Sequence, residues 1–110
     1  MIDSDLIEAV RKATVALFGS VDERCYVASE ALYYLAGGKA AGIKPMRHKW
    51  GGYRQAHWWL QDEDGTVVDV TAAQFPSGKY DFYAEGKGHG FQTRCSTDAT
   101  AIMALVRSGY

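Results

Sequence analysis

Three side chains of this chain are of the types that act together in thiol-based catalysis: Cys25, His57 and Asp69. A thiol attacks a carbonyl carbon as the thiolate, and a helix N-terminus or a nearby imidazolium lowers a thiol pKa from about 8.5 to roughly 3.5–7.5. The thiol also needs a base within hydrogen-bond reach, and that base needs a third group to fix its tautomer. We therefore expect Cys25 as nucleophile, His57 as general base and acid, and Asp69 as the group that orients His57.

The segment between the histidine and the aspartate predicts that the two side chains meet across a β-hairpin. Side chains alternate along a strand, so His57 shares a face with Trp59. A three-residue loop over 63–65, with its glycine in the left-handed conformation, pairs Trp59 with Asp69. His57 is then diagonal to Asp69, at about 7–8 Å between backbones, and the two side chains can bond. We expect the helix that carries Cys25 to pack its N-terminal end against this face.

Apolar residues recurring at three- and four-residue steps predict the helices that surround this hairpin. Each predicted helix has a capping residue or a glycine near its ends, and the three lie at 3–18, 25–36 and 96–109. Cys25 falls in the first turns of the second helix. Ser20 and Glu23, just ahead of it, have the spacing of a capping box.

The middle of the chain is rich in aromatic and β-branched residues, which favour strands, and it is interrupted by glycine-containing turn signals. Three antiparallel strands are predicted, at 43–49, 54–61 and 66–70. Shorter strand candidates lie at 80–83 and 90–93. The order of two helices, a sheet and a helix indicates one α+β domain over 1–110, with helices on one side of an antiparallel sheet.

Composition restricts the classes of partner. The chain has 110 residues, enough for one core, and its 12 Lys+Arg against 13 Asp+Glu give a formal charge of −1. This balance provides no broad positive field for nucleic acid or an anionic membrane, so neither is an expected partner. The first residues lack the features of a signal peptide, and no apolar run is long enough to span a bilayer. We therefore expect a cytoplasmic protein with two free thiols, Cys25 and Cys95.

The residues around the three candidates resemble the core of transglutaminase-like and papain-like cysteine enzymes. The resemblance covers roughly 25–75 and consists of a helix-borne Cys25, the strand His-Trp-Trp-Leu over 57–60, and Asp-Gly-Thr-Val-Val-Asp-Val-Thr over 64–71. It implies a minimal papain-like or transglutaminase-like fold, a Cys-His-Asp triad in the order given above, and a supporting position at Thr71. The implied activity is amide cleavage by a peptidase or amidase acting on a protein or peptide. A transglutaminase or a protein deamidase would use the same triad.

The residues before the nucleophile depart from the pattern of papain-like enzymes. Those enzymes place a Gln several residues earlier to help hold the oxyanion, whereas 19–24 here are Gly-Ser-Val-Asp-Glu-Arg. The oxyanion would then depend on the backbone N–H of Cys25 and on a second donor, for which Gln55 is a candidate. Trp59 is a candidate for the substrate-binding wall, although a Trp pair on a strand more often packs.

The remaining polar residues favour no other chemistry. Cys95 precedes the last helix, and no C-x-x-C, H-x-x-x-H or H-x-E spacing predicts a zinc site, so we expect neither a metal nor a cofactor. The glycine-rich stretch 86–90 lacks the strand-before and helix-after context of a phosphate loop and is interpreted as a rim loop. The alternative from a different class is a catalytically inert protein-binding module on the same fold, which would have an ordinary, slow thiol.

Overall fold

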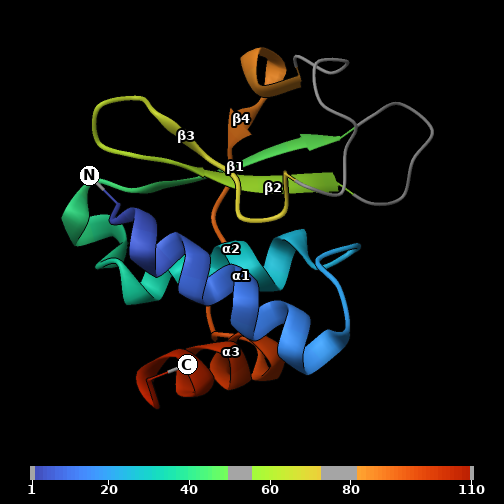
Figure 1. Cartoon of the computed structure of the whole chain (residues 1–110). Coiled ribbons are helices and arrows are strands. Elements are labelled where there is room, and N and C mark those ends of the chain that lie inside the picture. The colour runs from blue at the N-terminus through green and yellow to red at the C-terminus, as the bar shows by residue number, and fades with distance from the viewer. Residues whose placement is uncertain (1, 50–55, 73–81, 110) are drawn as a thin grey trace.

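The computed structural model describes residues 2–49, 56–72 and 82–109. In chain order its elements are α1 (Ser4–Phe18), α2 (Cys25–Leu35), the 3-10 helix η1 (Gly38–Ala41), β1 (Lys44–Lys49), β2 (Ala56–Gln61), β3 (Val67–Val68), the 3-10 helix η3 (Phe82–Glu85), β4 (Lys87–Gly88) and α3 (Thr97–Arg107). Figure 1 labels these helices and strands where there is room.

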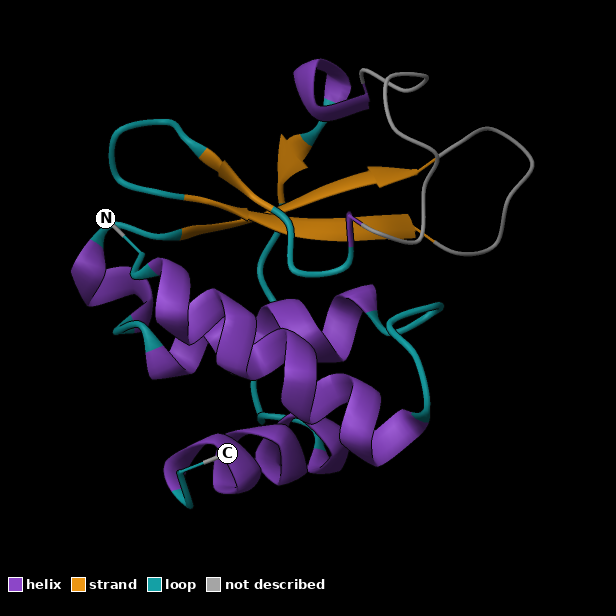
Figure 2. Cartoon of the chain, in the orientation of Figure 1, coloured by secondary structure: helices purple, strands orange, loops and turns teal. Residues whose placement is uncertain are grey.

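The sheet has the strand order β3-β2-β1-β4, and each pair of neighbours is antiparallel. α2 packs against β2, and both α1 and α3 pack against α2. Figure 2 shows the three α-helices on one side of the sheet and η3 on the other. The predicted α+β class, with helices on one side of an antiparallel sheet, is confirmed.

α1 is closed at both ends by groups visible in the sequence. The Asp3 carboxylate accepts a hydrogen bond from the backbone N–H of Asp5 at 2.8 Å. Gly19 adopts φ 87° and donates its N–H to the carbonyl of Val15, which ends the helix. The predicted helix over 3–18 is confirmed to within one residue.

α2 begins at Cys25 as predicted, but no capping box precedes it. The hydroxyl of Ser20 accepts from the N–H of Asp22, two residues on, at 3.1 Å. Glu23 has φ 61°, so the chain turns sharply between Ser20 and the helix. Arg24 occupies the N-cap position and makes no side-chain capping bond. The capping-box prediction is wrong because this left-handed residue redirects the backbone.

The hairpin of β2 and β3 has the predicted register. Asp62 donates its N–H to the carbonyl of Thr66 at 2.8 Å, and Gly65 adopts φ 88°. Leu60 pairs with Val68, as the three-residue loop requires. β3 is shorter than the predicted strand over 66–70. Continuing the same register places the candidate histidine and aspartate diagonally across the hairpin.

The two short strand candidates late in the chain are wrong. The described part of 80–83 belongs to the 3-10 helix η3, and 90–93 contains no strand, whereas β4 lies between them and pairs with β1. Gly86 allows this path because its backbone lies against the indole of Trp59. A Cβ at this position would stand 2.1 Å from Trp59 Cζ2. Residues 90–93 instead pass from the sheet edge towards α3.

The core lies between the sheet and the helices. Leu32 of α2, Leu60 of β2 and Ile102 of α3 are fully buried in it. α3 begins where predicted, because the Ser96 hydroxyl accepts from the N–H of Ala99 at 3.2 Å. It ends two residues before the predicted limit.

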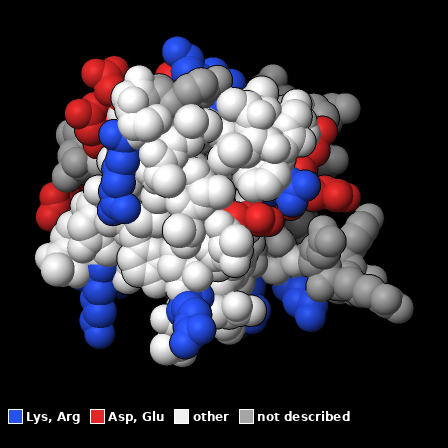
Figure 3. Space-filling view, turned by 90° about the horizontal axis from the view of Figure 1, so that it is seen from below, with Lys and Arg blue, Asp and Glu red and all other residues white. Residues whose placement is uncertain are grey.

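The surface over the helices carries dispersed charges of both signs among uncharged side chains (Figure 3). This distribution agrees with the near-balance of acidic and basic residues in the sequence. Among the residues that the structure describes, no helix combines the length and the apolar character needed to cross a membrane.

Candidate active site

Cys25 is the first residue of α2 and lies half-buried beside the start of β2. Its thiol donates a hydrogen bond to the carbonyl of Ala56, with 3.6 Å between sulfur and oxygen. The helical ladder begins with the N–H of Ala28 bonding to the carbonyl of Arg24, so the N–H groups of Cys25 and Tyr26 precede it. The positive end of the helix dipole therefore favours negative charge at this sulfur.

His57 lies on β2 with a side chain that is only 2% exposed. Its Nε2 is 2.6 Å from Oδ2 of Asp69, and Cys25 lies close enough to the ring to raise its pKa. The indole of Trp59 stacks on the imidazole, with 5.7 Å between ring centroids and 27° between planes. The imidazole is thus held by the Asp69 carboxylate and the stacked indole of Trp59.

The surroundings of His57 change its protonation. Burial acts to lower the pKa of His57, but the hydrogen bonds and negative charges of Asp69 and Cys25 outweigh it and raise the pKa from 6.5 to about 9. The ring is therefore an imidazolium at neutral pH.

Asp69 accepts four hydrogen bonds, which hold its carboxylate in one orientation. Oδ1 accepts from the backbone N–H of Thr71 at 3.1 Å and from the Thr71 hydroxyl at 3.3 Å. Oδ2 accepts from the Tyr83 hydroxyl at 2.6 Å and from the ring of His57 at the same distance. Thr71 therefore bonds to the Asp69 carboxylate through both its backbone and its side chain.

Tyr83 is a site residue that the sequence analysis missed. It lies on η3, and its ring meets Trp59 edge to face, with 5.1 Å between centroids. Burial and the bond to Asp69 raise the pKa of Tyr83, so the phenol keeps its proton and acts as a donor. The only sequence signal was an aromatic residue at the end of a predicted strand, and no spacing rule links it to the hairpin.

α2 covers the face of β2 opposite to the expected one. The ring of Tyr26 meets Trp58 edge to face at 4.9 Å, so Trp58 points towards the helices. His57 and Trp59 alternate with it and point to the other face, towards η3. Cys25 lies beside Ala56, the first residue of β2, and not above the face of the sheet that carries His57.

The two candidate substrate-binding residues have different outcomes. Trp59 is 1% exposed, so it supports the back of His57 and presents no surface to a substrate. Packing, the more common role of a strand Trp, is what the structure shows for it. Gln55 lies outside the described residues. The N–H groups at the start of α2, beginning with that of Cys25, precede the helical ladder and are donors of the kind that an oxyanion hole uses.

Cys95 and His89 lie apart from the triad and do not form a second site. The thiol of Cys95 accepts from the Thr100 hydroxyl at 3.7 Å and lies 4.0 Å from the Met103 sulfur, within the first turns of α3. His89 donates from Nδ1 to the neighbouring carbonyl of Gly90 at 2.9 Å. Within 2–49, 56–72 and 82–109, no three His, Cys, Asp or Glu side chains form a group that could hold a metal ion.

Comparisons with protein-family models, with curated proteins and with solved structures return no match to this chain. The case for a function therefore depends on the geometry of the side chains.

Proposed function

We propose that this protein is a cysteine-dependent acyl-transfer enzyme that cleaves an amide, as a peptidase or amidase, through Cys25, His57 and Asp69. One observation carries the proposal: a buried imidazole bonds to a carboxylate at 2.6 Å and lies close enough to a thiol at a helix N-terminus for that thiol to raise its pKa. This is the relation of nucleophile, base and orienting acid that defines a triad by geometry. We also propose that the fold is a minimal member of the papain-like and transglutaminase-like class.

In the first half-reaction the Cys25 thiolate attacks the carbonyl carbon and forms a C–S bond. Negative charge develops on the carbonyl oxygen, which the N–H groups at the start of α2 stabilise. The His57 imidazolium gives its proton to the departing nitrogen as the C–N bond breaks. The products are an amine, a neutral imidazole and an acyl-thioester on Cys25.

In the second half-reaction the neutral imidazole of His57 takes a proton from an acceptor that attacks the thioester. If the acceptor is water, a carboxylic acid leaves, Cys25 is again a thiolate, and the outcome is hydrolysis. If the acceptor is an amine, the outcome is that of a transglutaminase, and a side-chain carboxamide hydrolysed by water gives a deamidase. A fluorescent primary amine supplied together with the acyl donor would separate transfer from hydrolysis.

Selective alkylation tests the proposed nucleophile. An ordinary thiol with a pKa of about 8.5 is only about 3% ionised at pH 7, so loss of an activating imidazole should slow alkylation about tenfold or more. We expect iodoacetamide at pH 7 to modify Cys25 before Cys95, and His57→Ala to remove this preference. His89→Ala is the matched control, since His89 is an exposed histidine outside the triad. The rates are measured by mass spectrometry of the two cysteine peptides.

The acyl-enzyme is the second test. We expect carbonyl electrophiles such as activated acyl esters to leave an adduct on Cys25 that hydroxylamine removes, as it removes a thioester. Cys25→Ser should abolish this adduct, and Cys95→Ser should leave it unchanged. Equal labelling of both cysteines, with no dependence on His57, would instead support the inert protein-binding module. The proposed peptide or protein substrate is tested by identifying the acyl donor in a lysate, and the proposed cytoplasmic location is tested by cell fractionation.

A further inference from the structure

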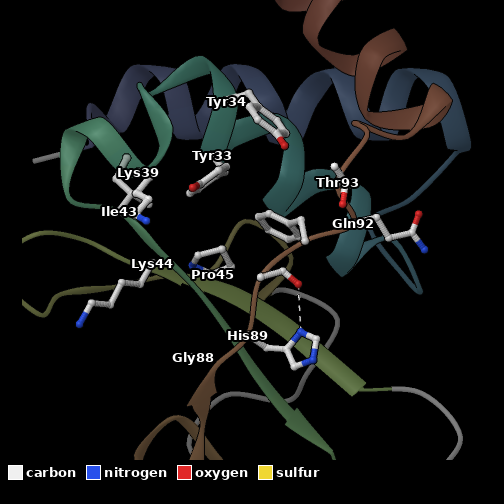
Figure 4. A pocket seen from close by; sticks show the side chains of 12 residues that line it. Tyr33, Tyr34, Lys39, Ile43, Lys44, Pro45, Gly88, His89, Gln92 and Thr93 are labelled. Atoms are coloured by element: carbon white, nitrogen blue, oxygen red, sulfur yellow. Dashed lines mark hydrogen bonds between the residues drawn. The ribbon is translucent and has the colours of Figure 1, made fainter.

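A pocket of about 450 Å³ lies between the C-terminal half of α2, η1, the start of β1 and the segment that follows β4. Figure 4 shows its lining side chains, which come from these four parts of the chain. None of the three triad residues lines it. The pocket is therefore a separate cavity on the helix-facing side of the sheet.

Its lining combines aromatic rings with positive charge. Tyr33 contacts Tyr34 and Phe91 edge to face, with centroids 5.2 and 5.3 Å away. Lys39 and Lys44 lie together at one end, with the Lys44 amino group directed outwards (Figure 4). The described residues that line the pocket include no Asp or Glu. An apolar or aromatic group thus fits the rings, and an anionic group fits the lysine end.

The pocket is connected to the candidate active site by a row of aromatic rings. Phe91, in the pocket lining, stacks on Trp58 with centroids 5.4 Å apart and meets Tyr26 edge to face at 5.3 Å. Tyr26 directly follows Cys25 on α2. Tyr33 lies about two helical turns further on, which places the pocket about 12 Å along the helix from the thiol. An extended peptide covers this distance with about four residues.

We propose that this pocket binds a segment of the peptide substrate that carries an aromatic side chain beside an acidic one. The aromatic side chain lies on Tyr33 and Phe91, and the carboxylate lies at the Lys39 and Lys44 end, farther from the thiol. The continuation of this segment to Cys25 rests on the proposed function. Binding of the segment to the pocket is independent of that function, because binding requires no chemistry at the thiol.

Binding is measured on the Cys25→Ala variant, which is unable to form an acyl-enzyme. The probes are three capped peptides: acetyl-Ala-Ala-Phe-Glu-amide, acetyl-Ala-Ala-Phe-Lys-amide and acetyl-Ala-Ala-Ala-Glu-amide. Affinities come from calorimetry, and the site comes from chemical-shift changes of backbone amides. We expect the Phe-Glu peptide to bind best, the Phe-Lys peptide about fivefold more weakly, and the Ala-Glu peptide about tenfold or more weakly.

A charge variant assigns the preference to the pocket. Changing Lys39→Gln together with Lys44→Gln should abolish the preference for Glu over Lys in the peptide, whereas Lys12→Gln on α1 should leave it intact. The proposal is overturned if the Phe-Glu peptide shifts no amides of the pocket, or if the double variant keeps the full preference. Selective binding in a protein whose Cys25 shows no activated reactivity would retain the pocket and refute the enzyme. An activated Cys25 thiol in a protein that does not bind the peptides would refute the pocket proposal and retain the proposed enzyme.

Discussion

Replacing Asp69 by asparagine removes the negative charge that faces His57 while keeping the shape of the side chain. The carboxylate oxygen lies 2.6 Å from Nε2, and with Cys25 it raises the pKa of His57 from 6.5 to about 9 against the effect of burial. This change corresponds to about 3 kcal/mol in favour of the imidazolium, at about 1.4 kcal/mol for each pH unit. Because His57 stays buried in Asp69→Asn, we expect its pKa to fall by about two pH units or more.

The same perturbation should change how stability depends on pH. The folded protein binds the His57 proton more tightly than the unfolded chain, so this contribution is fully present below about pH 6.5. It declines as pH rises and is lost above about pH 9. Between about pH 6 and pH 9.5 we therefore expect the free energy of unfolding to lose up to about 3 kcal/mol from this group, and Asp69→Asn to remove most of that decline.

Nuclear magnetic resonance of ¹⁵N-labelled histidine rings measures the His57 pKa directly, and urea unfolding at a series of pH values measures the linked stability. Asp64→Asn is the matched control, because Asp64 is an exposed acid on the same hairpin that bonds only locally, to the N–H of Thr66 at 3.0 Å. It should leave the His57 titration unchanged. A pKa near 6.5 in the unmodified protein, or one that stays near 9 in Asp69→Asn, would refute the reasoning.

Two further substitutions test the support behind the triad. Tyr83→Phe removes a hydrogen-bond donor from Asp69, so we expect the free energy of unfolding in urea to fall by about 2 kcal/mol. We also expect a small further rise in the His57 pKa, which a purely structural role of Tyr83 would not produce. Gly86→Ala places a Cβ against Trp59 and should cost about 2 kcal/mol, seen as a lower Tm, whereas Gly90→Ala meets no atom within 4 Å and should be nearly neutral. An unchanged His57 pKa in Tyr83→Phe, or equal Tm values for the two glycine variants, would contradict these expectations.

The parts of the site predicted from sequence are those fixed by local chain geometry. A loop over 63–65 that ends in a left-handed glycine admits one register, and the alternation of strand side chains then sets which residues meet across the hairpin. The start of α2 at Cys25 was predicted from apolar periodicity, although the residues assigned to its cap were wrong. In that case the backbone turn at Glu23 decided the local structure, and side-chain spacing alone did not reveal it.

The parts that were not predicted depend on contacts between distant segments. Tyr83 reaches Asp69 only because η3 returns to the far side of the sheet, and Gly86 permits that return by lying against Trp59. The face of β2 that α2 covers is the one that carries Trp58. Alternation along the strand allows either face, so sequence spacing alone does not distinguish the two.

The proposed nucleophile and its proposed base belong to different layers of the domain, Cys25 to the helices and His57 to the sheet. A slide of the two layers by an ångström would separate sulfur from imidazole and leave the imidazole–carboxylate pair intact. The alkylation rate of Cys25 would then report how the two layers are aligned. Substitutions deep in the core, remote from any substrate, would change the reactivity of Cys25 through packing alone.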